Sequence, residues 1–507
     1  MTETRGDGPQ LIAYADRLGG NLQGLRSLLE GPFAGAFDGV HVLPFFTPFD
    51  GVDAGFDPED HTAVDPRLGT WDDVRALAAD RTVMADVIVN HVSSRSALFA
   101  DVRERGDDSP HADMFLTYSS IFPDGATEED LARIYRPRPG LPFTALRLGG
   151  TRRLVWTTFT SDQVDLDLRS ASAWRYVTSV VDNLVDNGVT LLRLDAVGYT
   201  GKAAGTSCFM TPETFEIMRR IREHAHSRGA RVLVEVHGHH GEQIEIAREV
   251  DLVYDFALPP LVLHALTAAD LAPLAHWIDL RPRNSITVLD THDGIGVIDV
   301  GTSDTRPGEP GLLEPVQIDA LVERMHANSG GGSRLATGAA ASNLDLYQVN
   351  CTFYDALGGD DVRYVLARLI QLFVEGVPQI YYVGLLAGSN DLELLQASGV
   401  GRDVNRHHYT AAEIDDALGR PVVREILAAL RLRRDHPAFA GTPTWQFDGA
   451  TATSRWTAGD AATELTFDVR DSSYQVSATE PGGDWRVVLD STDLRERVVQ
   501  NPPPVRE

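Results

Sequence analysis

Eight short apolar runs, each ending in polar or charged residues, constrain the fold of this chain more than any other feature. Their cores are rich in valine, isoleucine and leucine without strict alternation, which is typical of strands buried on both faces of a parallel sheet. Most runs are separated by enough residues for a crossover helix. The pattern therefore predicts an α/β fold, a (β/α)8 TIM barrel with strands at 10–15, 39–44, 81–91, 189–196, 230–237, 252–257, 285–293 and 377–384.

Two connecting segments, 173–186 and 212–228, carry apolar residues at helical spacing and are predicted to be barrel helices. Two other connections are too long for a single crossover, so we expect inserted loop-rich subdomains after the third and seventh strands. Short, polar, β-leaning segments near the end predict a small C-terminal β domain. The predicted boundaries are 1–91, 187–293 and 354–436 for the barrel, 92–186 and 294–353 for the insertions, and 437–507 for the β domain.

The chain is strongly acidic. It has 45 lysine plus arginine and 73 aspartate plus glutamate residues, a formal net charge of −28. Nucleic acids and anionic membranes bind basic surfaces, so we expect neither as a partner. No apolar run approaches the roughly 20 residues that span a bilayer, the N-terminus lacks a signal-peptide pattern, and two cysteines are too few for a disulfide framework. These features predict a cytoplasmic protein.

Charged residues at the ends of four predicted strands form a candidate active site. In a (β/α)8 barrel the carboxyl ends of the strands surround the active site, and buried carboxylates are costly unless they have partners or a task. Any one of these residues alone could be a helix cap or half of an ion pair, but the whole set favours an active site. The residues are Asp86 with His91, Arg193 with Asp195, Glu235, and His292 with Asp293.

The set suits the retaining cleavage of a glycosidic bond. That chemistry uses two carboxyl groups about 5–5.5 Å apart, of which one attacks the anomeric carbon and the other is first acid and then base. Asp195 and Glu235 end neighbouring strands, so we expect them to face each other. Arg193 points to the same side of its strand as Asp195, and its charge is expected to keep Asp195 ionised. Glu235 then serves as acid/base, and Asp293 stabilises the transition state.

Four sequence blocks resemble the characteristic blocks of the α-amylase superfamily, glycoside hydrolase family 13. They are DVIVNH at 86–91, LRLDAV at 192–197, Glu235, and LDTHD at 289–293. The resemblance implies a retaining enzyme on a (β/α)8 barrel. It also implies Asp195 as nucleophile, Glu235 as acid/base and Asp293 as transition-state stabiliser, the same roles that the chemistry suggests.

Seven further segments carry a narrower resemblance over nearly the whole chain. They are YADR at 14–17, LPFFTPFD at 43–50, DAGFD at 53–57, YRPRPGLP at 135–142, AGTSCFM at 204–210, YDFALPP at 254–260 and NLDLYQVN at 343–350. In these segments the chain resembles the bacterial sucrose phosphorylases, hexosyltransferases that convert sucrose and inorganic phosphate reversibly into α-D-glucose 1-phosphate and D-fructose. The resemblance implies a covalent β-glucosyl intermediate on Asp195, with no cofactor and no metal.

By match of position, the resemblance implies two groups of binding residues. The glucosyl pocket is Asp53, Phe56, His91, Phe159, Gln163, Arg193, His292 and Arg402, and the acceptor side is Tyr199, Asp345, Tyr347 and Gln348 with Arg138. Phosphate is an anion that enters a site holding three carboxylates, and guanidinium binds phosphate oxygens with a planar fork. We therefore expect Arg138 and Arg136 to meet the phosphate, although their proline-rich loop could instead be only a structural clamp.

The sequence leaves several alternatives open. A sister phosphorylase acting on sucrose 6′-phosphate, glucosylglycerol or glucosylglycerate, a sucrose-hydrolysing relative, and a catalytically silent binding protein would share much of this pattern. Asp345 would repel a phosphorylated acceptor, which favours plain sucrose, and the complete carboxylate set argues against a silent relative. The histidines in HGHH at 237–240 suggest either a metal site or, as we expect, solvated loop residues. The assembly is expected to be a monomer or a homodimer.

Overall fold

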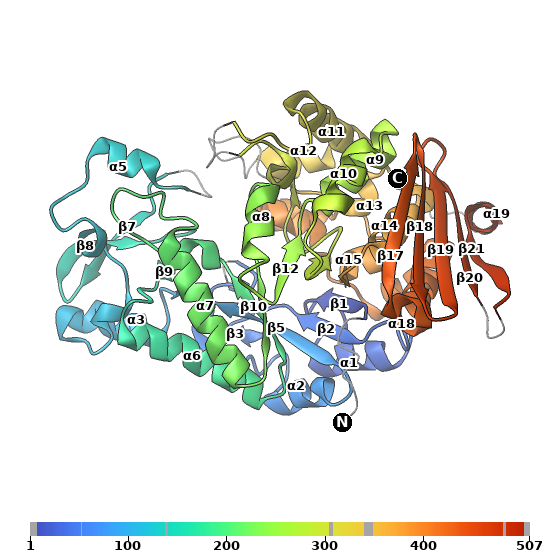
Figure 1. Ribbon diagram of the computed structural model, residues 1–507. Helices are drawn as coiled ribbons and strands as arrows, with labels where there is room; N and C mark the ends of the chain where they lie inside the picture. Colours follow the sequence, from blue (N-terminus) through green and yellow to red (C-terminus); the bar gives the residue numbers. More distant parts are fainter. Residues whose placement is uncertain are drawn as a thin grey trace.

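The computed structural model describes residues 8–51, 53–136, 140–303, 308–338, 348–479 and 483–500. Its centre is a closed barrel of eight parallel strands (Figure 1). Each predicted run contains one barrel strand, so the predicted (β/α)8 barrel is confirmed. In order around the barrel the strands are β1 (Gln10–Ala13), β16 (Val377–Tyr381), β13 (Ser285–Thr287), β12 (Leu252–Asp255), β11 (Arg231–Val234), β10 (Leu191–Asp195), β5 (Thr82–Ile88) and β2 (Gly39–Val42).

The strands are buried on both faces, and their register positions the site. In β10 the first four of five residues are buried, which explains the continuous apolar run in the sequence. Arg193 in β10 is in register with Asp86 in β5 and with Leu233 in β11. Residues in register on adjacent strands point to the same face of the sheet. The side chains of Arg193 and Asp86 therefore lie next to each other.

The two helices predicted from apolar spacing are present as α6 (Ala171–Asp186) and α7 (Pro212–Ser227). Ser170 caps α6, and Thr211 caps α7 directly before a proline that suits the first helical turn. Within the described part of the chain, no helix combines the length and apolar character that crossing a bilayer requires. Further helices are α1 (Leu22–Glu30), α2 (Trp71–Ala78), α8 (His240–Ile246), α9 (Leu258–Ala268), α10 (Ala272–Leu280), α14 (Asp361–Phe373) and α18 (Pro421–Asp435).

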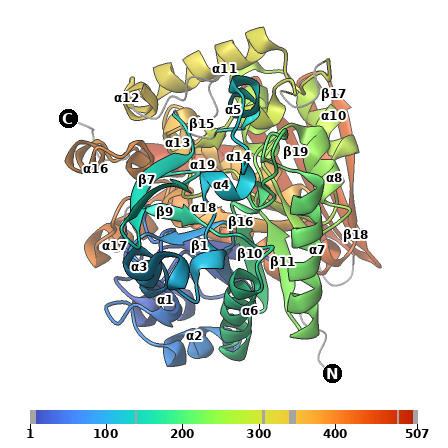
Figure 2. The same ribbon diagram turned by 90° about the vertical axis from the view of Figure 1, so that its left-hand side faces the viewer.

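A long excursion leaves the barrel between β5 and β10 and projects to one side of it (Figures 1 and 2). Part of it has a small hydrophobic core that is separate from the barrel core, which supports an inserted subdomain. The predicted boundaries 92–186 remain a prediction. The last helix in that range, α6, packs on β5 of the barrel. Five of the core residues, Leu116, Ile121, Phe122, Ile134 and Trp156, lie in the excursion, and the sixth, Cys208, comes from the segment after β10. The excursion contains β6 (His91–Ser93), α3 (Ala97–Arg105), α4 (Tyr118–Ile121), α5 (Glu128–Arg133), β7 (Phe143–Leu148), β8 (Thr151–Trp156) and β9 (Gln163–Asp165).

The segment after β13 is more helical than the loop-rich subdomain that the sequence predicts. The glycine-rich run at 329–333 forms the turn between two helices, where Gly330 and Gly331 have φ values of 61° and 87°. Glycine adopts this left-handed region at little steric cost, so the run marks a tight turn and not a long loop. The segment contains β14 (Ile295–Gly296), the 3-10 helix η4 (Ile298–Val300), α11 (Pro315–Asn328), α12 (Gly332–Gly338) and β15 (Gln348–Val349).

The predicted C-terminal β domain is a five-stranded antiparallel sheet at the side of the barrel opposite the excursion (Figure 1). Buried residues alternate along β20, as expected for a sheet with one packed face. Trp456 donates a hydrogen bond to the Phe373 carbonyl at 2.8 Å and ties the sheet to the end of α14. The strands are β17 (Thr442–Asp448), β18 (Thr451–Ala458), β19 (Ala461–Asp468), β20 (Ser473–Thr479) and β21 (Trp485–Asp490), followed by α19 (Ser491–Gln500), a helix that the sequence analysis does not predict.

Candidate active site

A buried charge network lies at the carboxyl ends of β5 and β10. Arg193 Nη1 donates hydrogen bonds to Asp86 Oδ1 at 2.5 Å and to Asp195 Oδ1 at 2.7 Å. The other oxygen of Asp86 lies 2.9 Å from His41 Nε2 on β2. Burial raises the pKa of Asp86, but His41 and Arg193 outweigh burial and lower that pKa to about 2. Asp86 is therefore an anion that orients Arg193 toward Asp195.

Glu235 directly follows β11 and faces the same guanidinium. Its Oε2 accepts a hydrogen bond from the Ala196 N–H at 3.3 Å and lies 4.0 Å from Arg193 Nη2. Ala196 comes immediately after Asp195 and has a left-handed backbone, with φ of 53°, which a residue other than glycine adopts at a cost. Adjacent strands thus bring Asp195 and Glu235 to one guanidinium, as the sequence predicts.

Burial and the charge of Arg193 act in opposite directions on the ionisation of Asp195. Burial raises the pKa of Asp195 to about 8; Arg193 opposes this shift, and repulsion by the Glu235 carboxylate adds to it. Arg193 acts on Asp195 in the direction that the sequence analysis expects, but it also binds Asp86, and burial has the larger effect on Asp195 in the ligand-free protein.

Asp293 follows β13 and faces two guanidinium groups. Arg402 Nη1 lies 2.8 Å from Asp293 Oδ1, and Arg406 Nη2 lies 3.8 Å from the same oxygen. Burial raises the pKa of Asp293, but Arg402, His292 and Arg406 outweigh burial and hold it well below its usual range. Asp293 is therefore an anion in the free protein. Sequence reasoning missed Arg406, which also donates to the His292 carbonyl at 2.9 Å; it ends no strand, so no strand signal pointed to it.

Aromatic rings line the region around these carboxylates. The rings of Phe56 and His292 stack with centroids 4.7 Å apart and planes 10° apart. The Phe159 ring lies 5.3 Å from the His91 ring and meets the Tyr199 ring edge-on at 5.1 Å. Such rings can pack on a sugar ring and exclude water from it.

Polar groups complete the predicted glucosyl pocket. Gln163 Nε2 lies 3.0 Å from His91 Nε2 and 3.5 Å from Asp53 Oδ2, and Arg402 Nη1 lies 4.0 Å from Asp53 Oδ1. Burial lowers the pKa of His91, and it lowers that of His292 to about 3, so both rings are neutral hydrogen-bonding groups at neutral pH. All eight predicted pocket residues thus lie in one connected cluster. A small cavity beside it is lined by Ile12, His41, Arg193, Tyr254, Phe256, Thr291, His292 and Asp293.

Comparisons with known proteins identify the family. The family model for the alpha amylase catalytic domain matches residues 2–259. The sucrose phosphorylase of Bifidobacterium adolescentis is 52% identical over 98% of this chain and 99% of that protein, and the sucrose phosphorylase of Agrobacterium vitis is 58% identical over 85% of this chain and 89% of that protein. The chain belongs to the sucrose phosphorylase family. The crystal structure of sucrose 6F-phosphate phosphorylase from Thermoanaerobacter thermosaccharolyticum is similar at 34% identity, with a TM-score of 0.89 over 96% of this chain and 99% of that one.

Family membership makes the strand-end cluster the candidate active site of a glycosyl-transferring enzyme, but its acceptor side is described only in part. Tyr199 lies in the 3-10 helix η3 (Val197–Tyr199) and is buried. Gln348 Nε2 lies 3.2 Å from His237 Nε2. Arg136, one of the two predicted phosphate ligands, donates to the Gly140 carbonyl of its own loop at 3.0 Å. The remaining predicted residues, Arg138, Asp345 and Tyr347, lie outside the described residues.

The histidines that follow Glu235 are not all solvated, contrary to expectation. His237 and His239 are each only 6% exposed. His237 Nδ1 lies 2.9 Å from Asp299 Oδ2, and His239 Nε2 lies 2.9 Å from the Pro310 carbonyl oxygen. Both partners belong to the segment after β13, more than 60 residues later in the chain. The polar pattern of the loop itself gives no sign that a distant segment covers it.

A buried lysine joins three parts of the fold and was also missed. The Lys202 ammonium lies 2.7 Å from Asp165 Oδ2, 2.9 Å from Asn90 Oδ1 and 2.5 Å from the Tyr199 carbonyl oxygen. Its side chain is 2% exposed. Lys202 is the only lysine of the sequence, a signal that could have singled it out. A compact ammonium suits a cage of oxygen atoms better than a planar guanidinium does.

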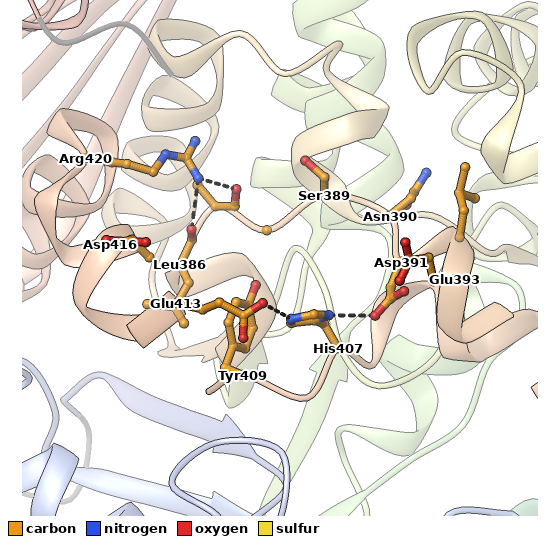
Figure 3. A pocket seen from close by; sticks show the side chains of 14 residues that line it. Leu386, Ser389, Asn390, Asp391, Glu393, His407, Tyr409, Glu413, Asp416 and Arg420 are labelled. Atoms are coloured by element: carbon orange, nitrogen blue, oxygen red, sulfur yellow. Dashed lines mark hydrogen bonds and ion pairs between the residues drawn. The ribbon is translucent and has the colours of Figure 1, made fainter. Parts of the chain in front are cut away.

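A larger cavity, of about 590 Å³, opens in the segment after β16 (Figure 3). Its charged side chains bind one another: His407 lies between Asp391, 2.6 Å from Nδ1, and Glu413, 3.1 Å from Nε2. Arg420 donates to two backbone carbonyls of the cavity wall. Asp391 also caps the helix α16 (Leu392–Ser398), and Glu413 completes the capping box of α17 (Ala411–Gly419), whose N-cap is Thr410. These contacts hold together the segment that carries Arg402, so we assign the cavity a structural role.

Proposed function

We propose that this chain catalyses the reversible phosphorolysis of sucrose, which gives α-D-glucose 1-phosphate and D-fructose. The observation that carries the proposal is the arrangement of Asp195 and Glu235 around Arg193 in a member of the sucrose phosphorylase family. Two neighbouring carboxyl groups, one acting as nucleophile and the other as acid and then base, suit a double displacement through a covalent β-glucosyl intermediate. The mechanism requires no cofactor.

In the first step, Glu235 gives its proton to the glycosidic oxygen while Asp195 attacks the anomeric carbon. The bond to fructose breaks, fructose leaves with the proton, and a glucosyl ester forms on Asp195. Arg193 lies closer to Asp195, at 2.7 Å, than to Glu235, at 4.0 Å, so it favours the reactive state in which Asp195 is the anion. The anionic Asp293 faces the positive charge that develops on the sugar ring.

In the second step, phosphate replaces fructose beside the glucosyl ester. Glu235, now a carboxylate, accepts a proton from a phosphate hydroxyl, and that oxygen attacks the anomeric carbon. Asp195 leaves as a carboxylate, and two inversions give the α-anomer of the product. Phosphate brings negative charge to a site that holds three carboxylates. We therefore keep Arg138 as the proposed phosphate ligand, on the grounds of its sequence position and of the fork that guanidinium offers to phosphate oxygens.

The choice of sucrose as the glucosyl donor rests on the relatives. Two sucrose phosphorylases are 52% and 58% identical to this chain, whereas the structurally similar sucrose 6F-phosphate phosphorylase is 34% identical. That difference supports sucrose over its phosphorylated derivative. The partners proposed are sucrose, inorganic phosphate, glucose 1-phosphate and fructose.

Product analysis tests the proposed function. The purified protein is incubated with sucrose, with and without inorganic phosphate, and glucose 1-phosphate, glucose and fructose are measured. Glucose 1-phosphate and fructose formed in equal amounts with phosphate would support the proposal. Free glucose and fructose at the same rate with or without phosphate would make the chain a hydrolase, and no turnover would point to another glucosyl donor.

A further inference from the structure

The fully buried Asp299 makes three hydrogen bonds next to the candidate active site. It lies in η4 and accepts from His237 Nδ1 at 2.9 Å, from the Gly238 N–H at 3.1 Å and from Gln243 Nε2 at 3.0 Å. A Cβ atom on Gly296 would stand 2.1 Å from the Asp299 carboxylate, so only glycine fits at that position. The local structure is thus built around one carboxylate, and none of the steps proposed above uses it.

Asp299 fixes the imidazole ring of His237. The ring stacks on Phe256 with centroids 3.9 Å apart and planes 12° apart, and its side chain is only 4% exposed. Because Asp299 accepts from Nδ1, the other ring nitrogen points into the site. His237 Nε2 lies 3.8 Å from Glu235 Oε1 and 3.2 Å from the Gln348 amide nitrogen. A carboxylate that binds one nitrogen of a histidine sets the orientation of the ring and influences whether the other nitrogen donates or accepts a hydrogen bond.

Three carboxylates from three different elements act on this ring. Burial lowers the pKa of His237, but Asp299 in η4, Glu235 after β11 and Asp293 after β13 outweigh burial, so the pKa is raised above its ordinary value. An imidazolium at this place would put a positive charge within 4 Å of the acid/base carboxylate. Uncharged acceptors such as water and fructose gain little from that charge, whereas phosphate gains a charge-assisted hydrogen bond.

We propose that Asp299 is a positioning residue that holds the His237 ring with Nε2 aimed at the acceptor side and favours its protonated form, and so favours phosphate over uncharged acceptors. The inference rests on the proposed function and deepens it. Asp299 acts only through His237 and touches no reacting atom. A merely structural role for Asp299 would lower all activities together, whereas a role through His237 changes the partition of the glucosyl group between phosphate and water.

The test uses three variants of the full chain: Asp299→Asn, His237→Gln and the double variant. Asparagine keeps the shape of the side chain but removes its charge. The assay measures glucose 1-phosphate against free glucose from sucrose at fixed phosphate, and kcat/KM for phosphate between about pH 5.5 and 8.5, the range in which histidine titrates. We expect Asp299→Asn to lower the ratio of phosphorolysis to hydrolysis by about tenfold, the loss of one hydrogen bond to a charged group. We also expect the alkaline decline in kcat/KM to move to lower pH.

The double variant decides whether Asp299 acts through His237. If it does, Asp299→Asn has no further effect on the product ratio in the His237→Gln background. Additive effects, or an unchanged ratio and pH profile in Asp299→Asn, would overturn the inference. If Asp299→Asn does not fold, as judged by its melting curve, His237→Gln alone decides, and an unchanged product ratio there refutes the proposal. Failure of the unmodified protein to form any glucose 1-phosphate would instead refute the proposed function.

Discussion

Replacement of Lys202 by methionine is expected to destabilise the protein strongly. Methionine keeps the length of the side chain but removes the ammonium that contacts Asp165, Asn90 and the Tyr199 carbonyl. The Asp165 side chain is 0% exposed and would keep its hydrogen bond from the Thr158 N–H at 3.0 Å, but it would lose its counter-charge. Removing one partner of a buried ion pair costs about 3–5 kcal/mol, which is roughly a 100- to 4,000-fold change in the unfolding equilibrium.

The prediction is measured by urea unfolding, followed by tryptophan fluorescence, with the first transition compared between variants. Trp156 is a local reporter, because the Lys202 ammonium lies 5.6 Å from its ring centroid. The double variant Lys202→Met with Asp165→Asn removes both charges and is expected to regain most of the loss. Arg228→Met is the matched control, because it removes an exposed basic side chain that pairs with Asp182. It should lower the free energy of unfolding by less than about 1 kcal/mol. If Lys202→Met lowers the free energy of unfolding by less than about 1 kcal/mol, the argument from the buried ion pair is refuted.

Four further predictions concern the active site. Glu235→Gln should slow sucrose cleavage by about 100- to 10,000-fold, as expected for loss of a general acid, with an unchanged circular dichroism spectrum; substantial remaining activity would exclude Glu235 from that role. Because the pKa of Asp195 rises from 3.8 to about 8 on folding, the native protein binds more protons than the unfolded chain between these values and loses stability as the pH rises through them. Asp195→Asn should therefore raise the melting temperature more at pH 8 than at pH 5, and equal shifts at both would contradict the raised pKa. Arg402→Leu removes the nearer of the two guanidinium groups that face Asp293 and leaves the more distant Arg406, so initial rates should show kcat/KM for sucrose lowered by at least about tenfold; an unaltered kcat/KM would argue against a role for the Arg402–Asp293 ion pair. Arg138→Ala should impair phosphate use more than glucosyl-enzyme formation in single-turnover experiments, and equal losses in both steps would argue against a phosphate-specific role.

The barrel and the grouping of its strand-end carboxylates could be predicted from the sequence because both follow from local patterns. Strands such as β10 are buried on both faces, so their apolar runs are continuous. Asp195 and Glu235 sit at strand ends, and the closed barrel brings strand ends together whatever the intervening loops do. The pairing of β5 with β10 then places Asp86 beside Arg193, and this contact does not depend on how the loops fold.

The residues that sequence reasoning missed depend on contacts between distant segments. Lys202 meets Asn90 across 112 positions, and His237 meets Asp299 across 62. Neither contact produces a periodic pattern in the amino-acid sequence around the two residues that make it. The burial of the histidine-rich loop likewise depends on a segment folding back over it, so its polar composition wrongly suggested solvent exposure. The glycine-rich run at 329–333 lies in a segment that the sequence predicts to be loop-rich, although its glycines also suit the tight turn between α11 and α12.

The covalent glucosyl intermediate on Asp195 is the central claim, and mass spectrometry of the protein after a rapid acid quench tests it most directly. The protein is mixed with sucrose without phosphate, quenched, digested and searched for a glucosylated peptide; a second sample receives phosphate before the quench. A glucosyl group on the peptide that contains Asp195, lost on addition of phosphate as an equal amount of α-D-glucose 1-phosphate forms, is the predicted result. A glucosyl group on another residue, or one that persists when phosphate is added, would contradict the account.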